Sequence, residues 1–358
     1  MATYSYKCPS CGAGIPYNPT LGKFKCDYCL SEYTQEEISQ IYARQLAEDE
    51  DKAKRAASRE RQTDTPSEAQ LHGYNCASCG AVVTTTETTT ATFCYYCHNP
   101  VIISQRFVGD FKPDQIVPFK FDKQTAEQSF LNWIGKKRYL PPDFTSASQL
   151  EKLTGMYLPF WYADINVDFR YRGRSSSTRS WTSGNRRYTE TSYYSHAREG
   201  GIFLDDLFLN AYSKFDQDLI YGVGAFESAQ IQNFSSAFLS GFFAEQYDLD
   251  QARLQNTMDQ LAKDQSHKIV RESVSSFSGA VTEQFDTRLS SEDWLYTLLP
   301  IYILTYHFND KTYVFALNGQ TAKPYGEIPI NMKKLVRDAL IVALVIIVLG
   351  LLGGYFIW

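Results

Sequence analysis

The placement of cysteine is the feature that most constrains what this chain can fold into. All eight cysteines fall in C-x-x-C pairs, and the first two pairs recur 68 residues further along the chain, which indicates an internal duplication. Tetrahedral Zn²⁺ takes four thiolates, and two such pairs on a short hairpin supply them from opposite sides. We therefore predict two structural Zn²⁺ ions, each bound by one set of four cysteines: Cys8, Cys11, Cys26 and Cys29, and Cys76, Cys79, Cys94 and Cys97.

The segments between the cysteine pairs, Ile15–Lys25 and Val82–Phe93, are rich in Thr and aromatic residues and predict short strands. A unit of about 30 residues buries too little surface to fold alone, so bound zinc is expected to stabilise it. A redox role for the pairs is the alternative, but it would require a thioredoxin-like βαβ context that the flanking sequence lacks. The spacing therefore favours a closed structural site.

The residue after each pair bears on how the backbone turns beneath the sulfur atoms. Gly12 and Gly80 follow the first pair of each set, and glycine adopts positive φ without steric cost. Leu30 and His98 occupy the same place after the second pair. Four thiolates already complete each site, so His98 is expected to be a bystander, and zinc binding is expected at both sites.

Composition and segment order predict a chain of several domains. Aromatic residues make up 15% of the sequence, with 25 Tyr and 23 Phe, which favours a β-rich body. The predicted fold class is two small β zinc ribbons, an α+β body with antiparallel strands, and one C-terminal transmembrane helix. The expected boundaries are 1–33 for the first ribbon, 34–70 for a charged helix and linker, 71–105 for the second ribbon, 106–332 for the body and 333–358 for the anchor.

The segment between the two ribbons predicts a charged helix. Thr34 and Glu37 form a capping-box pattern, and an apolar stripe follows for two turns. Beyond Leu46 the stripe shrinks to alanines, and acidic residues precede basic ones. A solvated, ion-paired helix that spaces the ribbons is one interpretation, and a partner-binding coiled coil is the other.

The body contains segments of helical and of strand periodicity. Asp122–Lys137 predicts a helix, a second helix is expected to start at Asp248, and Phe234–Phe243 is also expected to be helical. Alternating apolar residues over 165–171 predict a strand, with its returning partner at 188–194. These elements indicate helices packed on antiparallel strands.

Two further patterns concern the strands of the body. Trp294–Phe308 and Lys311–Leu317 predict a hairpin around Asn309-Asp310. LPFWY at 158–162 and LPIYI at 299–303 each introduce a run of strand character. A second, much decayed duplication would explain this recurrence.

The C-terminus predicts a membrane anchor. Ala339–Trp358 holds twenty residues without a charge, enough for a helix of about 30 Å. Lys333, Lys334 and Arg337 precede it, and by the positive-inside rule they place the body in the cytoplasm. The expected localisation is therefore the cell membrane, as a single-pass protein with a cytoplasmic N-terminal body, and membrane lipids are expected partners of this helix.

An arginine-rich stretch over 170–198 is the most unusual part of the body. It holds seven arginines against one acid, Glu190, with Trp181 and several tyrosines between them. Arginine with exposed aromatic residues can bind phosphates of lipids or nucleic acid, or an acidic partner. A merely soluble hairpin tip is the alternative. The candidate contact residues are Arg172, Arg174, Arg179, Trp181, Arg186 and Arg187.

The sequence lacks the motifs of common enzymes. No G-x-x-x-x-G-K-[ST], H-E-x-x-H or G-x-S-x-G pattern is present, and the histidines of the body are scattered without acidic or cysteine neighbours. We therefore expect no enzymatic activity.

Two resemblances follow from these residues. YKCPSCGAGI…FKCDYC and YNCASCGAVV…FCYYC resemble the zinc-ribbon superfamily. GMYLPFWYADINVDFRYRGR, LSGFFAEQYD and LLPIYILTYHFNDKTYVFALNGQTAKPYGEIP are similar to bacterial membrane-anchored TFIIB-type zinc-ribbon proteins, which occur beside PspA-like and SPFH (flotillin-like) proteins. The second resemblance implies a non-enzymatic adaptor that recruits or positions such partners at the inner face of the membrane.

Local charge separates the two functional hypotheses. The first is a cytoplasm-facing membrane adaptor or scaffold with structural zinc, for which a homo-oligomer is one option. The second is a membrane-tethered regulator that binds nucleic acid through its ribbons. The net charge is +1 over 1–33 and −1 over 71–105, and the whole chain carries −5. Neutralised phosphates supply most nucleic-acid affinity, so such neutral ribbons favour the adaptor.

Overall fold

Strands dominate the fold, as the content of Tyr and Phe predicted. The first ribbon is an antiparallel sheet of β1 (Tyr17–Asn18), β2 (Lys23–Lys25) and β3 (Glu32–Tyr33). The second begins with a two-stranded sheet of β4 (His72–Asn75) and β5 (Val82–Thr85). The computed structural model describes residues 5–43, 72–76, 81–86, 88–94, 99–103, 111–146, 150–274 and 280–357.

The predicted capping box starts the helix that follows the first ribbon. Thr34 N donates to Glu37 Oε2 (2.7 Å), and Glu37 N donates to Thr34 Oγ1 (3.3 Å). The helix is described over 35–43, and the charged remainder of the predicted helix lies outside the described residues. The capping prediction is confirmed.

A ten-stranded sheet forms the body. Its strands are β6 (Thr89–Phe93), β7 (Pro100–Ile102), β8 (Gln115–Ile116), β9 (Thr154–Ser183), β10 (Arg186–Asn210), β11 (Gln232–Asn233), β12 (Phe243–Glu245), β13 (Val281–Phe308), β14 (Lys311–Asn318) and β15 (Pro324–Gly326). The order is β11-β8-β13-β9-β12-β6-β7, with β10 beside β9 and β14 and β15 beside β13. Because β6 and β7 follow the second ribbon's first strands, this ribbon continues directly into the body sheet.

Most strand pairs of this sheet are antiparallel, in agreement with that part of the predicted fold class, and two short pairs are parallel. β8 is parallel to β13, and β12 is parallel to β9. The predicted hairpin of β13 and β14 is confirmed, and these strands meet at Asn309 and Asp310, which both have positive φ. Positive φ at both central residues is the geometry of a type I′ turn. β10 returns along β9 as predicted, but residues 188–194 lie opposite 175–181 and not opposite 165–171.

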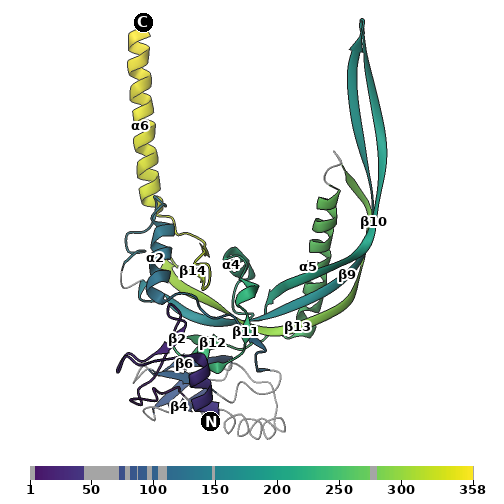
Figure 1. Cartoon of the computed structure of the whole chain (residues 1–358). Coiled ribbons are helices and arrows are strands. Elements are labelled where there is room, and N and C mark those ends of the chain that lie inside the picture. Colours follow the sequence, from purple (N-terminus) through teal and green to yellow (C-terminus); the bar gives the residue numbers. More distant parts are fainter. Residues whose placement is uncertain are drawn as a thin grey trace.

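Three long strands build an arm that projects from the body (Figure 1). β13 pairs with β9 only as far as Val281, opposite Arg174. Beyond that point β9 and β10 continue as a two-stranded hairpin, which closes at Gly184 with φ +61°. The arm and α6 (Met332–Ile357) extend from the body in the same direction (Figure 1).

Two amphipathic helices flank the sheet. α2 (Lys123–Ile134) starts at the N-cap Asp122 and buries Ala126, Phe130 and Ile134. α5 starts at the N-cap Asp250, two residues beyond the predicted start, and buries one apolar stripe. α5 covers Gln251–Ser273, and the shorter turns are α4 (Gln217–Gly222), η3 (Ser228–Gln230) and η4 (Ser236–Leu239).

The two LP segments meet at their leucines at the centre of the body. Leu158 of β9 lies opposite Leu299 of β13, so LPFWY and LPIYI run antiparallel about a local two-fold axis. The two short parallel strands, β8 beside β13 and β12 beside β9, follow the same symmetry. In each case the residue that directly precedes the LP segment pairs with the short strand. These pairs are Leu298 with Ile116 and Tyr157 with Ala244. The register supports the second duplication that the sequence suggested.

Buried hydrogen bonds repeat on the two sides of this axis. Trp161 Nε1 donates to Leu249 O (2.9 Å), and Tyr302 Oη donates to Phe121 O (2.9 Å). Trp161 and Tyr302 hold the fourth position of their LP segments, and each acceptor precedes the aspartate that caps a helix. Helix start and central strand are therefore connected in the same way in both repeats.

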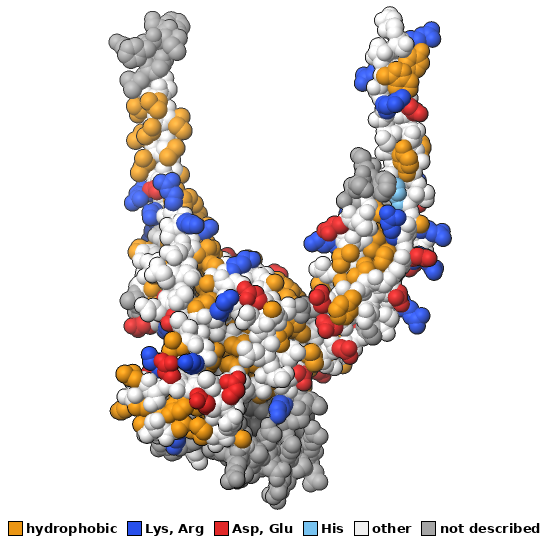
Figure 2. Space-filling model, in the orientation of Figure 1, with side chains coloured by type: hydrophobic (Ala, Val, Ile, Leu, Met, Phe, Trp, Pro, Cys, Tyr) orange, Lys and Arg blue, Asp and Glu red, His pale blue; other side chains and the backbone are white. Residues whose placement is uncertain are grey.

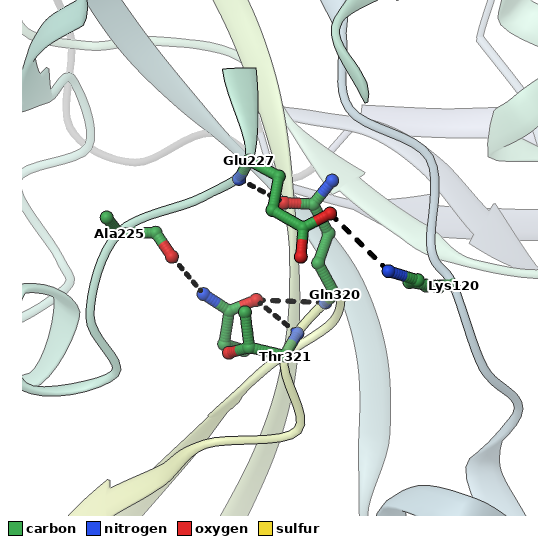
Figure 3. A network of polar contacts seen from close by, with 6 residues as sticks. Lys120, Ala225, Glu227, Gln320 and Thr321 are labelled. Carbon is green, nitrogen blue, oxygen red and sulfur yellow. Dashed lines mark hydrogen bonds and ion pairs between the residues drawn. The ribbon is translucent and has the colours of Figure 1, made fainter. Parts of the chain in front are cut away.

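An asparagine ends the hairpin of each repeat. Asn210 Oδ1 accepts from Tyr212 N (3.0 Å), and Asn318 Oδ1 accepts from Gln320 N (2.9 Å). In the second repeat the network extends further, because Glu227 N donates to Gln320 Oε1 (2.8 Å) (Figure 3). The turn after each hairpin is thus held by a side-chain amide.

Each helix covers the hairpin of the other repeat. α2 precedes β9 but packs on β14, with Phe130 and Phe315 rings 5.7 Å apart. α5 precedes β13 but packs on the arm, where Val270 and Val274 share a buried cluster with Tyr171. This exchange joins the two repeats into one core.

The apolar run Phe234–Phe243 is not a helix. It forms the 3₁₀ turn η4 and enters β12, with Gly241 at φ +98° between them. Ala237, Phe238 and Leu239 are all buried, so the run is apolar because it is surrounded by core. Uniform burial gives no helical periodicity, which is why the sequence was ambiguous.

The predicted membrane anchor is also overturned. Among the described residues, no helix is both long and apolar enough to cross a membrane. The transmembrane segment Ala339–Trp358, the fold class that included it and the single-pass membrane localisation are corrected accordingly.

Candidate metal centre and exposed arm

Four cysteines of the first ribbon converge on one point. Their sulfur atoms all lie within 4.8 Å of one another. Cys8 and Cys29 sulfurs are 3.5 Å apart, as are those of Cys11 and Cys26. Tetrahedral zinc with Zn–S bonds of about 2.3 Å requires S–S separations of about 3.8 Å. The cluster therefore has the ligand set and dimensions for a zinc ion.

Both cysteine knuckles have the same backbone. Cys8 N donates to Ala13 O (2.6 Å) and Cys26 N donates to Ser31 O (3.0 Å). The residue that follows each pair has left-handed backbone geometry, φ +76° at Gly12 and +61° at Leu30. Leucine thus adopts the turn for which glycine was expected.

The two exposed thiols of the cluster differ in acidity. Hydrogen bonding with the Ser31 side chain is the largest of the effects that lower the pKa of Cys29 to about 6. A backbone hydrogen bond at Ala13 lowers the pKa of Cys11, but desolvation and the neighbouring thiols outweigh it and raise it to about 12. Four thiols this close do not ionise together unless a cation offsets their repulsion.

The second cysteine set is described in part. Cys76 and Cys94 are buried and pack with Val101. Cys76 N donates to Ala81 O (2.7 Å) and Cys94 N to Asn99 O (3.0 Å), the same five-residue step as in the first ribbon. Their predicted co-ligands, Cys79 and Cys97, and the neighbouring His98 lie outside the described residues, so the second zinc site remains a prediction.

The first ribbon packs on the body and shares its core. Tyr17 N donates to Ser240 O (2.9 Å), and Ser240 Oγ donates to Ile15 O (2.8 Å). The Tyr17 and Phe238 rings meet edge to face, 5.1 Å apart. The ligands Cys8 and Cys26 belong to the same buried cluster as the body residues. No sequence signal indicated this docking, because isolated Tyr and Ser residues carry no pattern.

The arginine-rich residues all lie on the arm (Figure 2). Arg174 pairs with Glu283 (3.2 Å) and Arg179 with Glu190 (3.8 Å), in exposed positions. Arg172, Arg186 and Arg187 are exposed, and no ion pair of theirs is found among the described residues. The predicted contact residues therefore all lie on the arm, but the charges of Arg174 and Arg179 are partly offset by their glutamate partners.

Aromatic residues accompany these charges at the tip. Trp181 stacks on Tyr188 with ring centroids 5.7 Å apart, and the Arg179 guanidinium lies 5.1 Å from the Trp181 ring. Tyr193 is 80% exposed. Every residue from 176 to 191 is exposed, so the tip contributes almost nothing to the core.

Comparison with known proteins yields one informative relative. The chain is 26% identical over 330 residues to the uncharacterized protein YdjG of Bacillus subtilis (strain 168), covering 92% of this chain and 91% of that protein. No family model and no solved structure matches the chain. The similarity extends well beyond the cysteine-rich segments, but it carries no assigned activity.

Proposed function

We propose that this protein is a non-enzymatic adaptor, stabilised by structural zinc, that binds a partner protein through the tip of its arm. The observation that carries the proposal is the exposed two-stranded hairpin beyond β13. An isolated two-stranded hairpin is marginally stable in water, and this one adds little to the core. A long hairpin with exposed aromatic residues is instead suited to contact with another molecule.

The composition of the tip indicates the chemistry of the partner. Arg186 and Arg187 directly follow the turn, and the stacked Trp181 and Tyr188 provide an apolar surface near them. Arginine and aromatic side chains are the residue types enriched at binding hot spots. An acidic protein surface with an apolar centre would complement the tip. PspA-like or SPFH-like proteins are the partners that the sequence resemblance implies, and their identity remains a prediction.

The cysteine cluster supports a structural role for zinc in this adaptor. Four thiolates complete a tetrahedral shell, so a bound ion has no open position for water or substrate. The cluster lies where the ribbon joins the body core, and its ligands are two buried and two exposed cysteines. Zinc would hold the ribbon against the body rather than take part in a reaction.

Site-specific photo-crosslinking tests the proposal. A photoreactive residue replaces Tyr188 in the full-length protein, and a matched probe replaces the exposed Lys263 on α5. We expect discrete crosslinks to one protein from position 188 only. The yield of this crosslinked product should fall at least fivefold in an Arg186→Ser/Arg187→Ser background. The charge control is the double variant Lys263→Ser/Lys268→Ser, which should leave the crosslinks from position 188 unchanged.

Two results would contradict the proposed adaptor function. One is the same crosslinking pattern from positions 188 and 263. The other is tight binding of the full-length protein to duplex DNA, lost in the double arginine variant, which would favour the nucleic-acid regulator instead. DNA binding is measured at matched salt, because phosphate contacts are strongly salt-dependent.

A further inference from the structure

The internal two-fold axis of the body relates two pockets. One has a volume of about 540 Å³ and the other about 510 Å³. Each is built from a helix-capping aspartate and from the fourth residue of an LP segment: Asp122 with Tyr302 in the first, and Asp250 with Trp161 in the second. The pockets therefore occupy equivalent places in the two repeats.

The first pocket is lined by a segment of the first ribbon. Pro16, Tyr17 and Lys25 contribute to its wall, and Gly241 approaches the ring of Pro16 closely. A Cβ added at Gly241 would lie 3.0 Å from the Pro16 Cβ, so the body surface is shaped to receive this segment. A stretch of chain with proline, tyrosine and lysine thus forms one wall of the first of two equivalent pockets.

The second pocket is lined by body residues alone among those that the structure describes. Trp294 and Tyr296 lie five and three positions before the leucine of the second LP segment, where the first repeat has Leu153 and Gly155. Together with Trp161 and Tyr247 they provide four aromatic rings. At these two equivalent positions the second pocket therefore has aromatic rings where the first has a leucine and a glycine.

The second pocket is lined by two carboxylates, Asp114 and Asp250, and by one cation, Lys112, so its charged side chains are net negative and favour a cationic ligand. Asp114 Oδ2 accepts from Tyr296 N (2.8 Å) and Asp250 Oδ1 accepts from Arg253 N (2.9 Å), so each carboxylate uses one oxygen in these bonds. The Tyr296 hydroxyl is buried and has no hydrogen-bond partner among the described residues. Carboxylates beside tryptophan and tyrosine rings attract ammonium and guanidinium groups by charge and by cation–π interaction.

We propose that the second pocket binds an extended segment of a partner protein through a lysine or arginine side chain. The segment would lie as the ribbon segment lies on the first pocket, with its cation between Asp250 and the Trp161 and Trp294 rings. This binding proposal rests on the proposed adaptor function in one respect only, namely that the ligand is a segment of a protein. The test of the pocket uses the full-length protein, and its readout does not depend on the arm or on the partner of the arm.

The probe is a synthetic peptide with the sequence of residues 15–25, the segment that lies at the equivalent pocket. Its binding to the full-length, zinc-loaded protein is measured by titration calorimetry. We expect one site per chain, and at least tenfold weaker binding by a peptide with glutamine in place of both lysines. Asp250→Asn should also weaken binding at least tenfold, while asparagine keeps the helix cap.

Asp122→Asn is the matched control, because it removes the same charge from the first pocket. It should leave peptide binding unchanged. Trp294→Leu, which introduces the residue of the first pocket, should weaken binding without loss of zinc. Absence of peptide binding at millimolar concentration overturns the proposal. So does binding that Asp122→Asn weakens and Asp250→Asn does not, because the peptide would then be displacing the ribbon. Failure of the crosslinking experiment at the arm would affect neither readout.

Discussion

At the scale of single residues, the two knuckles of the first ribbon adopt one backbone with different residues. Gly12 and Leu30 both have left-handed φ, a conformation that costs an L-residue about 1–2 kcal/mol. Leu30 is largely exposed, so its side chain offsets little of this cost by burial. A Cβ at Gly12 would meet nothing within 4 Å, so the penalty of a substitution there is one of backbone conformation alone.

These facts predict substitutions of opposite sign. Leu30→Gly should raise the free energy of unfolding by up to about 1 kcal/mol, after the greater freedom of glycine in the unfolded chain is subtracted. Gly12→Ala should lower it by about 1 kcal/mol. Urea unfolding of the zinc-loaded protein measures both. Leu21→Gly is the control, since Leu21 is exposed with an ordinary φ and should lose stability. A loss at Leu30→Gly as large as at Leu21→Gly would contradict the strain argument.

The cap of α2 predicts a pH dependence. The backbone hydrogen bond from Thr125 is the largest of the effects that lower the pKa of Asp122. Because the folded pKa lies below the unfolded value of about 3.9, the ionised cap stabilises the fold above that pH. This contribution is lost as the pH falls through the folded pKa. Asp122→Asn should therefore make stability less dependent on pH below about 4. Unfolding curves at several pH values check this, and an unchanged slope would refute it.

At the scale of elements, local chemistry was predictable and long-range pairing was not. The capping box at Thr34, the hairpin turn at Asn309-Asp310 and the buried face of α2 follow from near neighbours in the sequence. The parallel pairs of β8 and β12 join residues far apart, and strands of two or three residues carry no periodicity. The run Phe234–Phe243 was misassigned for a related reason, since burial on all sides removes the pattern.

The repeated hydrogen bonds between helix start and central strand give a prediction for the body. Tyr302 Oη donates to Phe121 O in the core, and Tyr302→Phe removes only that donor. A buried carbonyl left without its partner costs about 1–3 kcal/mol. Tyr325→Phe is the control, because Tyr325 is 43% exposed and should change stability by less than about 0.5 kcal/mol. Equal effects of the two substitutions in urea unfolding would show that the Tyr302 bond contributes nothing.

At the scale of the whole molecule, the sequence predicted the four cysteines of the first cluster but not the packing of the first ribbon on the body. The four ligands of the first cluster were predictable because C-x-x-C spacing alone brings two sulfurs to one side of a knuckle. The docking of that ribbon on η4 depends on Tyr17, Ser240 and Phe238, which are distant in sequence. Ribbon and body were therefore expected as separate units, whereas the structure gives them a shared core.

The shared core makes zinc removal a global test. Elemental analysis of the purified protein should give two Zn²⁺ per chain, and Cys76→Ser/Cys79→Ser should reduce this to one. Chelation in the double variant removes the remaining ion, and should lower the melting temperature of the body as well as of the ribbon, because Cys8 and Cys26 pack in the body's buried cluster. Near-ultraviolet circular dichroism reports the body aromatics. A ribbon that loses zinc with no change in body melting would contradict the coupling.

The arm permits the opposite prediction, because it projects away from the core. Residues 176–193 can be replaced by Asn-Gly, which joins Ser175 to Tyr194 at positions that already pair across β9 and β10. Exposure along 176–191 means that little apolar burial is lost, so the free energy of unfolding should change by less than about 1 kcal/mol. The zinc content should be unchanged. Ser175 and His196 are a useful internal check, since their hydrogen bond (2.7 Å) lies just below the excision and should persist. If the truncated protein instead unfolds at much lower urea, the hairpin serves the stability of the fold, and the exposed Trp181, Tyr188, Arg186 and Arg187 would need another explanation.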